Sequence, residues 1–191
     1  ELTDLPLATM EEVAGSGVLP ARDIIEAIIN ILRYDREGLQ PETVACLERI
    51  KETVTGSGHD AMMRRDVGMS FLEDDYDEEG KPTGARRAKV ERLVEESLRD
   101  RSLLWRDVEW LVTDEATYAS MYGFELGMQD AAFELRDPLI EYHKKLSVRV
   151  NLLFLGGYFH AMKERVIDFW EVSHDLLAGD PATERLLPEL T

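Results

Sequence analysis

The chain has 191 residues, of which 44% are hydrophobic and 32% are charged, a balance that is ordinary for a globular domain. Acidic residues outnumber basic ones by 39 to 22, which gives a formal net charge of −17. This excess argues against nucleic acid or an anionic membrane surface as a partner, because both require surplus Lys and Arg.

The sequence also bears on cellular location. The single cysteine, Cys46, cannot form an intramolecular disulfide, so a cytoplasmic protein is expected. The longest strongly apolar run, residues 152–159, is far shorter than the roughly 20 residues of a membrane-spanning helix. The first residues carry no basic segment of the kind that opens a signal peptide. We therefore expect no membrane association.

Two helices are predicted in the N-terminal third, after a short turn at residues 10–14. The first follows Pro20, has isoleucines and leucine at helical spacing over residues 24–32, and stops before Gly38. The second starts at Pro41, keeps apolar residues at three- and four-residue steps, and stops at the Gly-Ser-Gly of residues 56–58. Together they predict a helical hairpin within residues 1–58.

An acidic loop is predicted next, within residues 59–84. Asp75, Asp77 and Glu79 stand at alternate positions before a glycine, which is typical of the opening of a calcium-binding EF-hand loop. The closing position of such a loop needs a bidentate glutamate, and Arg86 stands there instead. A solvated acidic loop without a cation is therefore the favoured interpretation, and a calcium-like site is the alternative.

Long helices are predicted for the rest of the chain. Helical spacing continues from residue 85 to 112, a fourth helix follows Thr113 and Asp114, and a last helix is predicted over residues 139–177. The fold class is therefore all-α: a helical bundle of about five helices, two of them long, in a single domain of residues 1–191. Its subdivisions are the hairpin (1–58), the acidic loop region (59–84), the main helices (85–178) and a tail (179–191).

The last helix carries histidines and glutamates at helical spacing, which suits a metal site inside a bundle. His160 and Glu164 are four residues apart, Glu171 and His174 are three apart, and Glu125 is the partner expected from a neighbouring helix. The neighbouring stripe of this helix is more hydrophobic, so it is the expected core face. That favours a solvated flank for the His/Glu stripe, with the metal site as the alternative.

Glycines and aromatic residues are concentrated in the second half of the chain. Gly123 and Gly127, together with Gly156 and Gly157, predict a close approach of two helices, which serves either packing or a flat ligand between them. Aromatic side chains on the predicted third and fourth helices are candidates for a subunit interface, since Trp and Tyr are enriched there. These interface candidates are Trp105, Trp110, Tyr118 and Tyr122.

No motif in the sequence names a reaction. No nucleophile elbow, phosphate-binding loop or dinucleotide fingerprint is present. The leading hypothesis is a non-catalytic helical protein that works by association, as a homodimer or as an acidic adaptor for a protein partner, with no cofactor. The alternatives are a helical-bundle enzyme that uses a divalent metal and a small-ligand sensor with a pocket near Gly123 and Gly156.

Overall fold

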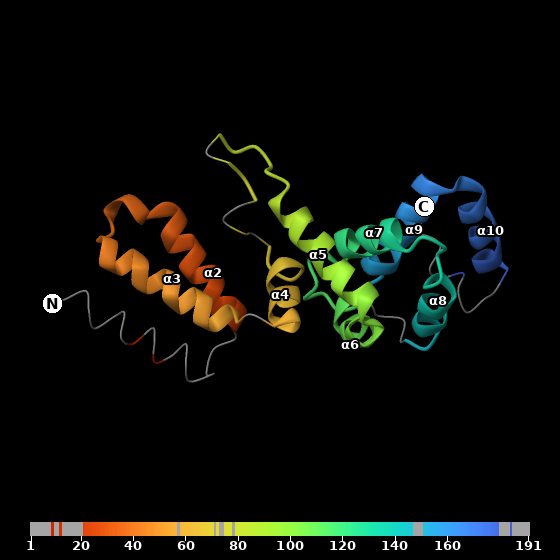
Figure 1. Ribbon diagram of the computed structural model, residues 1–191, viewed down its shortest axis with the longest axis horizontal. Coiled ribbons are helices and arrows are strands. Elements are labelled where there is room, and N and C mark those ends of the chain that lie inside the picture. Colours follow the sequence, from red (N-terminus) through yellow and green to blue (C-terminus); the bar gives the residue numbers. More distant parts are fainter. Residues whose placement is uncertain are drawn as a thin grey trace. The chain divides into compact units, whose positions relative to one another are not determined.

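A computed structural model shows an all-helical protein, as the sequence predicts (Figure 1). The described residues contain nine α-helices and one short 3-10 helix, and an isolated bridge between Tyr76 and Pro82 is the β-type pairing among them. None of the helices in this part of the chain is long and apolar enough to cross a membrane. The structure describes residues 9, 12, 21–56, 58–70, 72, 75–77, 79–146, 151–179 and 184.

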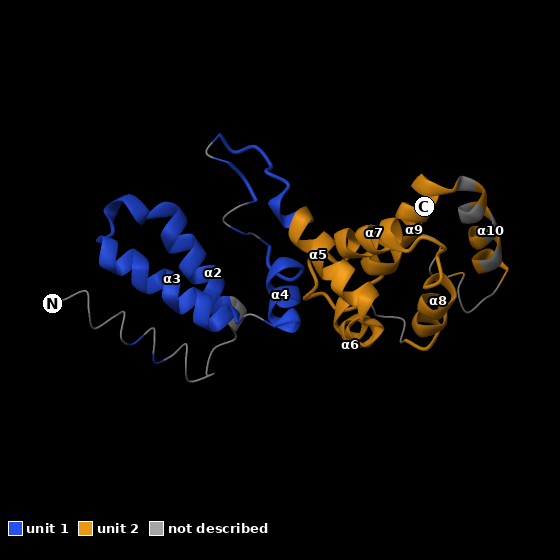
Figure 2. Ribbon diagram, in the orientation of Figure 1, with its two compact units in different colours: residues 1–86 blue, residues 87–191 orange. Residues whose placement is uncertain are grey.

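The chain divides into two compact units, residues 1–86 (unit 1) and residues 87–191 (unit 2) (Figure 2). Apart from residues 12 and 184, the predicted turn at 10–14 and the tail beyond Gly179 lie outside the described residues.

From residue 21 onward, unit 1 contains a pair of helices, α2 (Ala21–Tyr34) and α3 (Pro41–Thr55), joined through the short 3-10 helix η1 (Arg36–Gly38). Pro41 occupies the first helical turn of α3, where its missing N–H costs nothing. A shared hydrophobic core holds α2 against α3, and a shorter helix, α4 (His59–Asp66), follows. The buried residues of that core are Ile24, Ile28, Leu32, Leu47 and Ile50.

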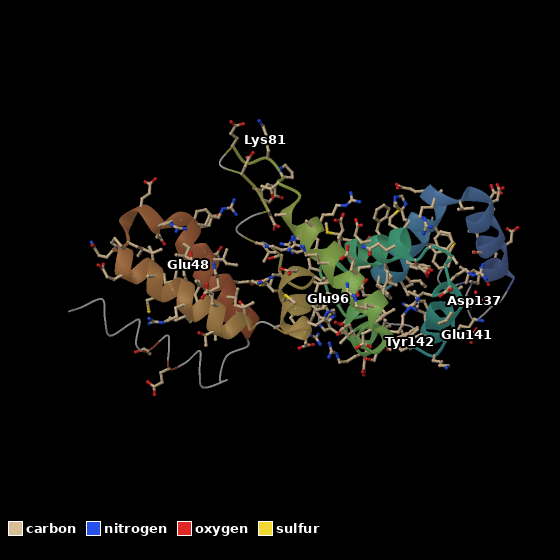
Figure 3. The ribbon with its side chains drawn as sticks, viewed as in Figure 1. Glu48, Lys81, Glu96, Asp137, Glu141 and Tyr142 are labelled. Carbon is tan, nitrogen blue, oxygen red and sulfur yellow. The ribbon has the colours of Figure 1, made fainter. Side chains whose placement is uncertain are left out.

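The acidic segment after α4 is organised as a tight turn. Tyr76 pairs with Pro82, and the side chain of Asp77 accepts hydrogen bonds from the backbone N–H groups of Glu79 and Lys81 at 2.9 and 2.8 Å. Gly80 has a φ of 77°, which only glycine adopts without strain. Lys81 stands on this exposed turn (Figure 3).

A buried arginine connects this turn to the end of α4. The guanidinium of Arg86 donates to both carboxylate oxygens of Asp75 and to the backbone carbonyls of Asp66 and Met69, the last at 2.6 Å. The side chains of Arg86 and Asp75 are only 6% and 10% exposed. The pair therefore fixes three backbone segments of unit 1 around one charge.

Unit 2 differs from the prediction in how its helices are divided. The single helix predicted over residues 85–112 is wrong: the structure has α5 (Ala85–Arg99) and α6 (Arg101–Leu111). Asp100 lies between them with an extended backbone, and its side chain accepts a hydrogen bond from the Ser102 N–H at 3.0 Å. This N-cap starts a new helix, because it satisfies a backbone donor that α5 would otherwise have bonded.

The single helix predicted over residues 139–177 is also wrong. The structure has α8 (Arg136–Lys144), on which Asp137, Glu141 and Tyr142 lie (Figure 3), then α9 (Leu153–Arg165) and α10 (Ile167–Ala178). Before α9, the side chain of Asn151 accepts from the Leu153 N–H at 2.8 Å. Between α9 and α10, Val166 is extended, with φ −149° and ψ 91°. The count of about five helices was too low because both long helices are interrupted and because α4 lies in the region predicted as a loop.

The centre of unit 2 is the contact between α7 (Ala119–Gln129) and α9. A Cβ atom added to Gly123 would lie 2.0 Å from the Phe154 carbonyl oxygen, and one added to Gly157 would lie 2.0 Å from the Ser120 carbonyl oxygen. A Cβ atom added to Gly127 would lie 2.7 Å from the Tyr158 carbonyl oxygen and 2.7 Å from the Cβ of Ala161. The close helix approach predicted from these glycines is therefore present, and it is made by backbone against backbone.

We expect Arg86→Met to destabilise unit 1 by about 3 kcal/mol, because it leaves the nearly buried Asp75 carboxylate without its cation. The matched control is Arg92→Met, which removes an exposed arginine from α5 and is expected to change stability by no more than about 0.5 kcal/mol. Urea unfolding followed by circular dichroism measures both. Equal effects of the two substitutions would contradict the role assigned to Arg86.

We expect Gly123→Ala to destabilise the protein by about 3 kcal/mol, although alanine favours helix, because the added methyl would collide with the backbone of α9. The control is Gly38→Ala, where an added Cβ meets no atom within 4 Å. Chemical unfolding of both variants gives the comparison. A Gly123→Ala protein as stable as the parent would show that α7 and α9 do not need this contact.

Candidate functional site

The solvent side of the α7–α9 pair carries a strip of apolar side chains. Phe124 and Met128 are one helical turn apart on α7, and Leu153 and His160 are two turns apart on α9, so each pair lies along one side of its helix. Met128 is 38% exposed and Leu153 is 45% exposed, which is high for large apolar residues. The rings of Phe124 and His160 are 5.6 Å apart and join the two halves of the strip. We call these four residues, with Glu164, the α7–α9 face.

Opposite charges lie on the two flanks of this face. On the α5 flank, the guanidinium of Arg87 is 5.8 Å from the centre of the Phe124 ring and its Nε is 2.7 Å from a carboxylate oxygen of Glu125. On the α9 flank, Glu164 lies 3.3 Å from Nε2 of His160. The side chains of Arg87 and Glu164 are both more than half exposed. The apolar strip is thus bordered by a cation on one side and an anion on the other.

Glu125 lies on the inner edge of the face. Its side chain is only 5% exposed, and burial raises the pKa of its carboxyl group, while the neighbouring Arg87 guanidinium acts in the opposite direction. Glu91 raises this pKa further by charge repulsion, and it too lies near Arg87, at 3.4 Å. Glu125 is therefore a buried carboxylate stabilised by one arginine.

The C-terminal end of α7 is held by a polar cluster. Arg165, the last residue of α9, donates to the backbone carbonyls of Gly127, Asp130 and Ala131 at 2.6, 2.8 and 3.0 Å. These bonds satisfy acceptors at and just beyond the end of α7. Arg165 is the last residue of α9 and Gly127 lies in the last turn of α7, so these bonds hold the C-terminal ends of the two helices together in addition to their glycine contact.

The side chain of Asp130 stabilises the turn that follows α7. It accepts from the N–H groups of Glu134 and Leu135 and from the hydroxyl of Tyr158, the last at 2.8 Å. Burial, followed by the bond to Asp130, raises the pKa of Tyr158, so its hydroxyl remains a donor. Phe133 within this turn has a φ of 52°, a strained value for a large side chain, and the Arg165 guanidinium stacks 4.5 Å from its ring centre.

The sequence did not identify Arg87, Asp130 or Arg165. Glu125 lies 38 residues from Arg87, the carbonyls that Arg165 binds lie 34 to 38 residues from it, and Tyr158 lies 28 residues from Asp130, so no local spacing points to these contacts. The position of Asp130 ahead of Leu135 is the one local signal, since an aspartate often accepts from backbone N–H groups a few residues later.

The residues predicted as metal ligands do not converge on one site. Glu125 pairs with Arg87, His160 pairs with Glu164 in an exposed position, His174 lies 3.8 Å from Asp175, and Glu171 is exposed. Among the described residues, no group of three or more His, Cys, Asp or Glu side chains could hold a metal ion. The five residues therefore do not form a metal site in this part of the structure.

The residues predicted as calcium ligands have protein partners. Asp75 binds the buried Arg86, Asp77 accepts from backbone N–H groups of its own turn, and Glu79 forms an exposed ion pair with Lys81. Their oxygens thus serve the turn and its arginine, which is a structural role.

Two of the four predicted interface aromatics lie inside unit 2. Tyr122 is completely buried and donates to the Ser97 hydroxyl at 2.8 Å, and burial raises its pKa. Trp110 is 8% exposed and donates to Glu115 at 3.1 Å. Their assignment to a subunit interface is corrected to the core, because helical spacing alone does not tell an inner face from an outer one. Trp105 is 36% exposed and lies near Tyr142, and Tyr118 is half-buried.

The pocket proposed for a flat ligand near Gly123 and Gly156 is also contradicted at Gly123. The space above Gly123 is occupied by the backbone of Phe154 and Tyr158, so no ligand fits there. Gly156 is half-buried.

The chain matches no protein-family model, no curated protein and no solved structure. Its function is therefore argued from the geometry of its own side chains.

The raised pKa of Glu125 predicts a pH-dependent stability. Because the folded state holds this proton more tightly than the unfolded state, its contribution to stability is greatest at low pH and is lost as pH rises through the folded pKa. The free energy of unfolding of the parent, minus that of Glu125→Gln, should therefore fall as the pH rises above about 4.5, the ordinary pKa of a glutamate. The control Glu109→Gln, at an exposed position on α6, should give a flat difference. Thermal or urea unfolding at a series of pH values provides the measurement, and a rising difference would contradict the assignment.

Proposed function

We propose that this protein is a non-catalytic helical assembly protein that associates with a second copy of itself through the α7–α9 face. The observations that support this are the exposed side chains of Met128 and Leu153 and the half-buried ring of Phe124 on the solvent side of the helix pair. Large exposed apolar side chains that gather on one side of a folded domain are a common feature of interaction sites.

The rigid packing of α7 against α9 beneath this strip favours binding of a second copy. The glycine contacts leave no room for α7 to slide or rotate against α9, and Arg165 holds their common end. A surface presented by a rigid backbone loses little conformational freedom when it binds, so more of its contact energy remains as affinity.

The flanking charges favour a second copy as the partner. In a twofold-symmetric contact, the same surface of each copy meets that of the other. A residue on one flank of the surface therefore faces residues that lie on the opposite flank in the second copy. With the axis along the strip, Arg87 of one copy faces Glu164 of the other while the apolar residues meet between them. The α7–α9 face is thus complementary to itself in both polarity and charge.

The net charge of the chain determines how self-association should depend on salt. Two chains of charge −17 repel each other, and added salt screens that repulsion, so self-association should strengthen as ionic strength rises. Binding to a basic protein partner, the acidic-adaptor alternative, would weaken under the same change. The direction of the salt effect therefore separates the two forms of the proposal.

We expect the double substitution Met128→Gln and Leu153→Gln to weaken self-association by about tenfold or more, because it removes the two most exposed apolar side chains of the face. The matched control is Tyr34→Gln, which removes an aromatic residue that is 72% exposed on α2. Sedimentation equilibrium at low and high salt measures all three proteins. The proposal is refuted if the parent remains monomeric at every salt and protein concentration. It is also refuted if Tyr34→Gln weakens self-association as much as the double substitution does.

A further inference from the structure

Unit 1 contains a cavity that the proposed assembly function does not use. Its volume is about 230 Å³, and it lies among α2, α3, α4 and Met69. Ile25 and Met69, which are 5% and 1% exposed, belong to one hydrophobic cluster and form its most buried wall. Val54 and Ala61, both half-buried, complete the apolar lining. The cavity therefore borders the hydrophobic core of unit 1.

The charged side chains of the lining already have partners within the protein. Asp60 and Arg64, one helical turn apart on α4, form an ion pair with 3.6 Å between Oδ1 and Nε, and both are well exposed to solvent. Arg65 donates to both carboxylate oxygens of Asp66 at 2.7 and 2.8 Å. Because these charges are paired with one another, the cavity does not require a charged ligand.

The size of the cavity suits a small organic molecule. An apolar cavity of about 150 Å³ is large enough to bind benzene, and sites for drug-sized ligands are usually about 300 to 1,000 Å³. A volume of about 230 Å³ therefore suits a molecule of one or two rings. Protein interiors are close-packed, so the atoms around a void lack contacts that a fitting molecule supplies. The thioether of Met69 favours an aromatic ring, because sulfur makes favourable contacts with such rings.

We propose that this cavity binds a small neutral aromatic molecule, of the size and chemistry of phenol or indole. The ring contacts Ile25, Val54 and Met69. Thr55, which is 8% exposed and also lines the cavity, adds a hydroxyl oxygen that can accept from the O–H or N–H of such a ligand. A charged ring compound would lose its hydration without compensation, because the charges of the lining are already paired. The cavity thus selects neutral rings over charged ones.

Calorimetric titration of the full chain with phenol, indole and toluene tests the proposal. At least one should bind with a Kd of about 1 mM or lower. Benzoate and benzylamine, which resemble toluene in shape but carry a charge, should bind about tenfold more weakly than the best neutral ligand or not at all. No binding by any of the three neutral compounds overturns the proposal. Binding of either charged compound as tight as that of the best neutral one overturns the selection of a neutral ring.

Variants locate the site. Ala61→Leu should abolish binding by filling the cavity, and the smaller change Ala61→Val should weaken it by about tenfold. The matched control Ala88→Leu makes the same enlargement at an exposed position of α5 and should leave affinity unchanged. Asp60→Asn should change affinity by no more than about twofold, because the ligand is uncharged. Circular dichroism confirms that each variant is folded. If folded Ala61→Leu or Ala61→Val binds as tightly as the parent, the ligand binds elsewhere and the assignment is wrong.

Discussion

The structure of unit 2 depends on the direct backbone contact between α7 and α9. Helices with ordinary side chains pack about 8–10 Å apart, and the clashes that a Cβ would cause at Gly123 and Gly157 show that this pair is closer. Close approach brings Tyr158 to Asp130 and Arg165 to the carbonyls of Gly127, Asp130 and Ala131. The polar cluster at the end of the pair follows from the glycine contact, since a wider spacing would carry these donors away from their acceptors.

In the described part of this acidic chain, the buried carboxylates all have partners within the fold. Glu125, Asp130 and Asp107 are almost fully buried, and each lies beside an arginine or accepts several hydrogen bonds. In unit 1, Arg86 plays the equivalent part for Asp75. A buried carboxylate without such partners would be costly. The negative charges that remain exposed set the interaction properties of the surface.

The sequence predicted the helical class and the close helix approach, because both are local signals: apolar spacing in one case and paired glycines in the other. It did not predict the interruptions. Asp100 is a good N-cap, but it lies between segments whose apolar spacing continues across it, and Val166 gives no local sign of an extended conformation. The charged partners of Glu125 and Asp75 were also missed, because charged residues are expected on the surface and their pairing depends on tertiary distance.

The exposed apolar strip and the acidic composition oppose each other, and this opposition shapes the proposed function. Apolar surface promotes association with many partners, whereas a net charge of −17 repels other acidic surfaces and other copies that meet in the wrong orientation. Under the proposal, two copies associate when the apolar strips meet and Arg87 lies opposite Glu164, because only then do burial and local charge pairing together exceed the general repulsion. In the proposed dimer, specificity is therefore expected to come from the exposed arginine on one flank of the α7–α9 face and the exposed glutamate on the other.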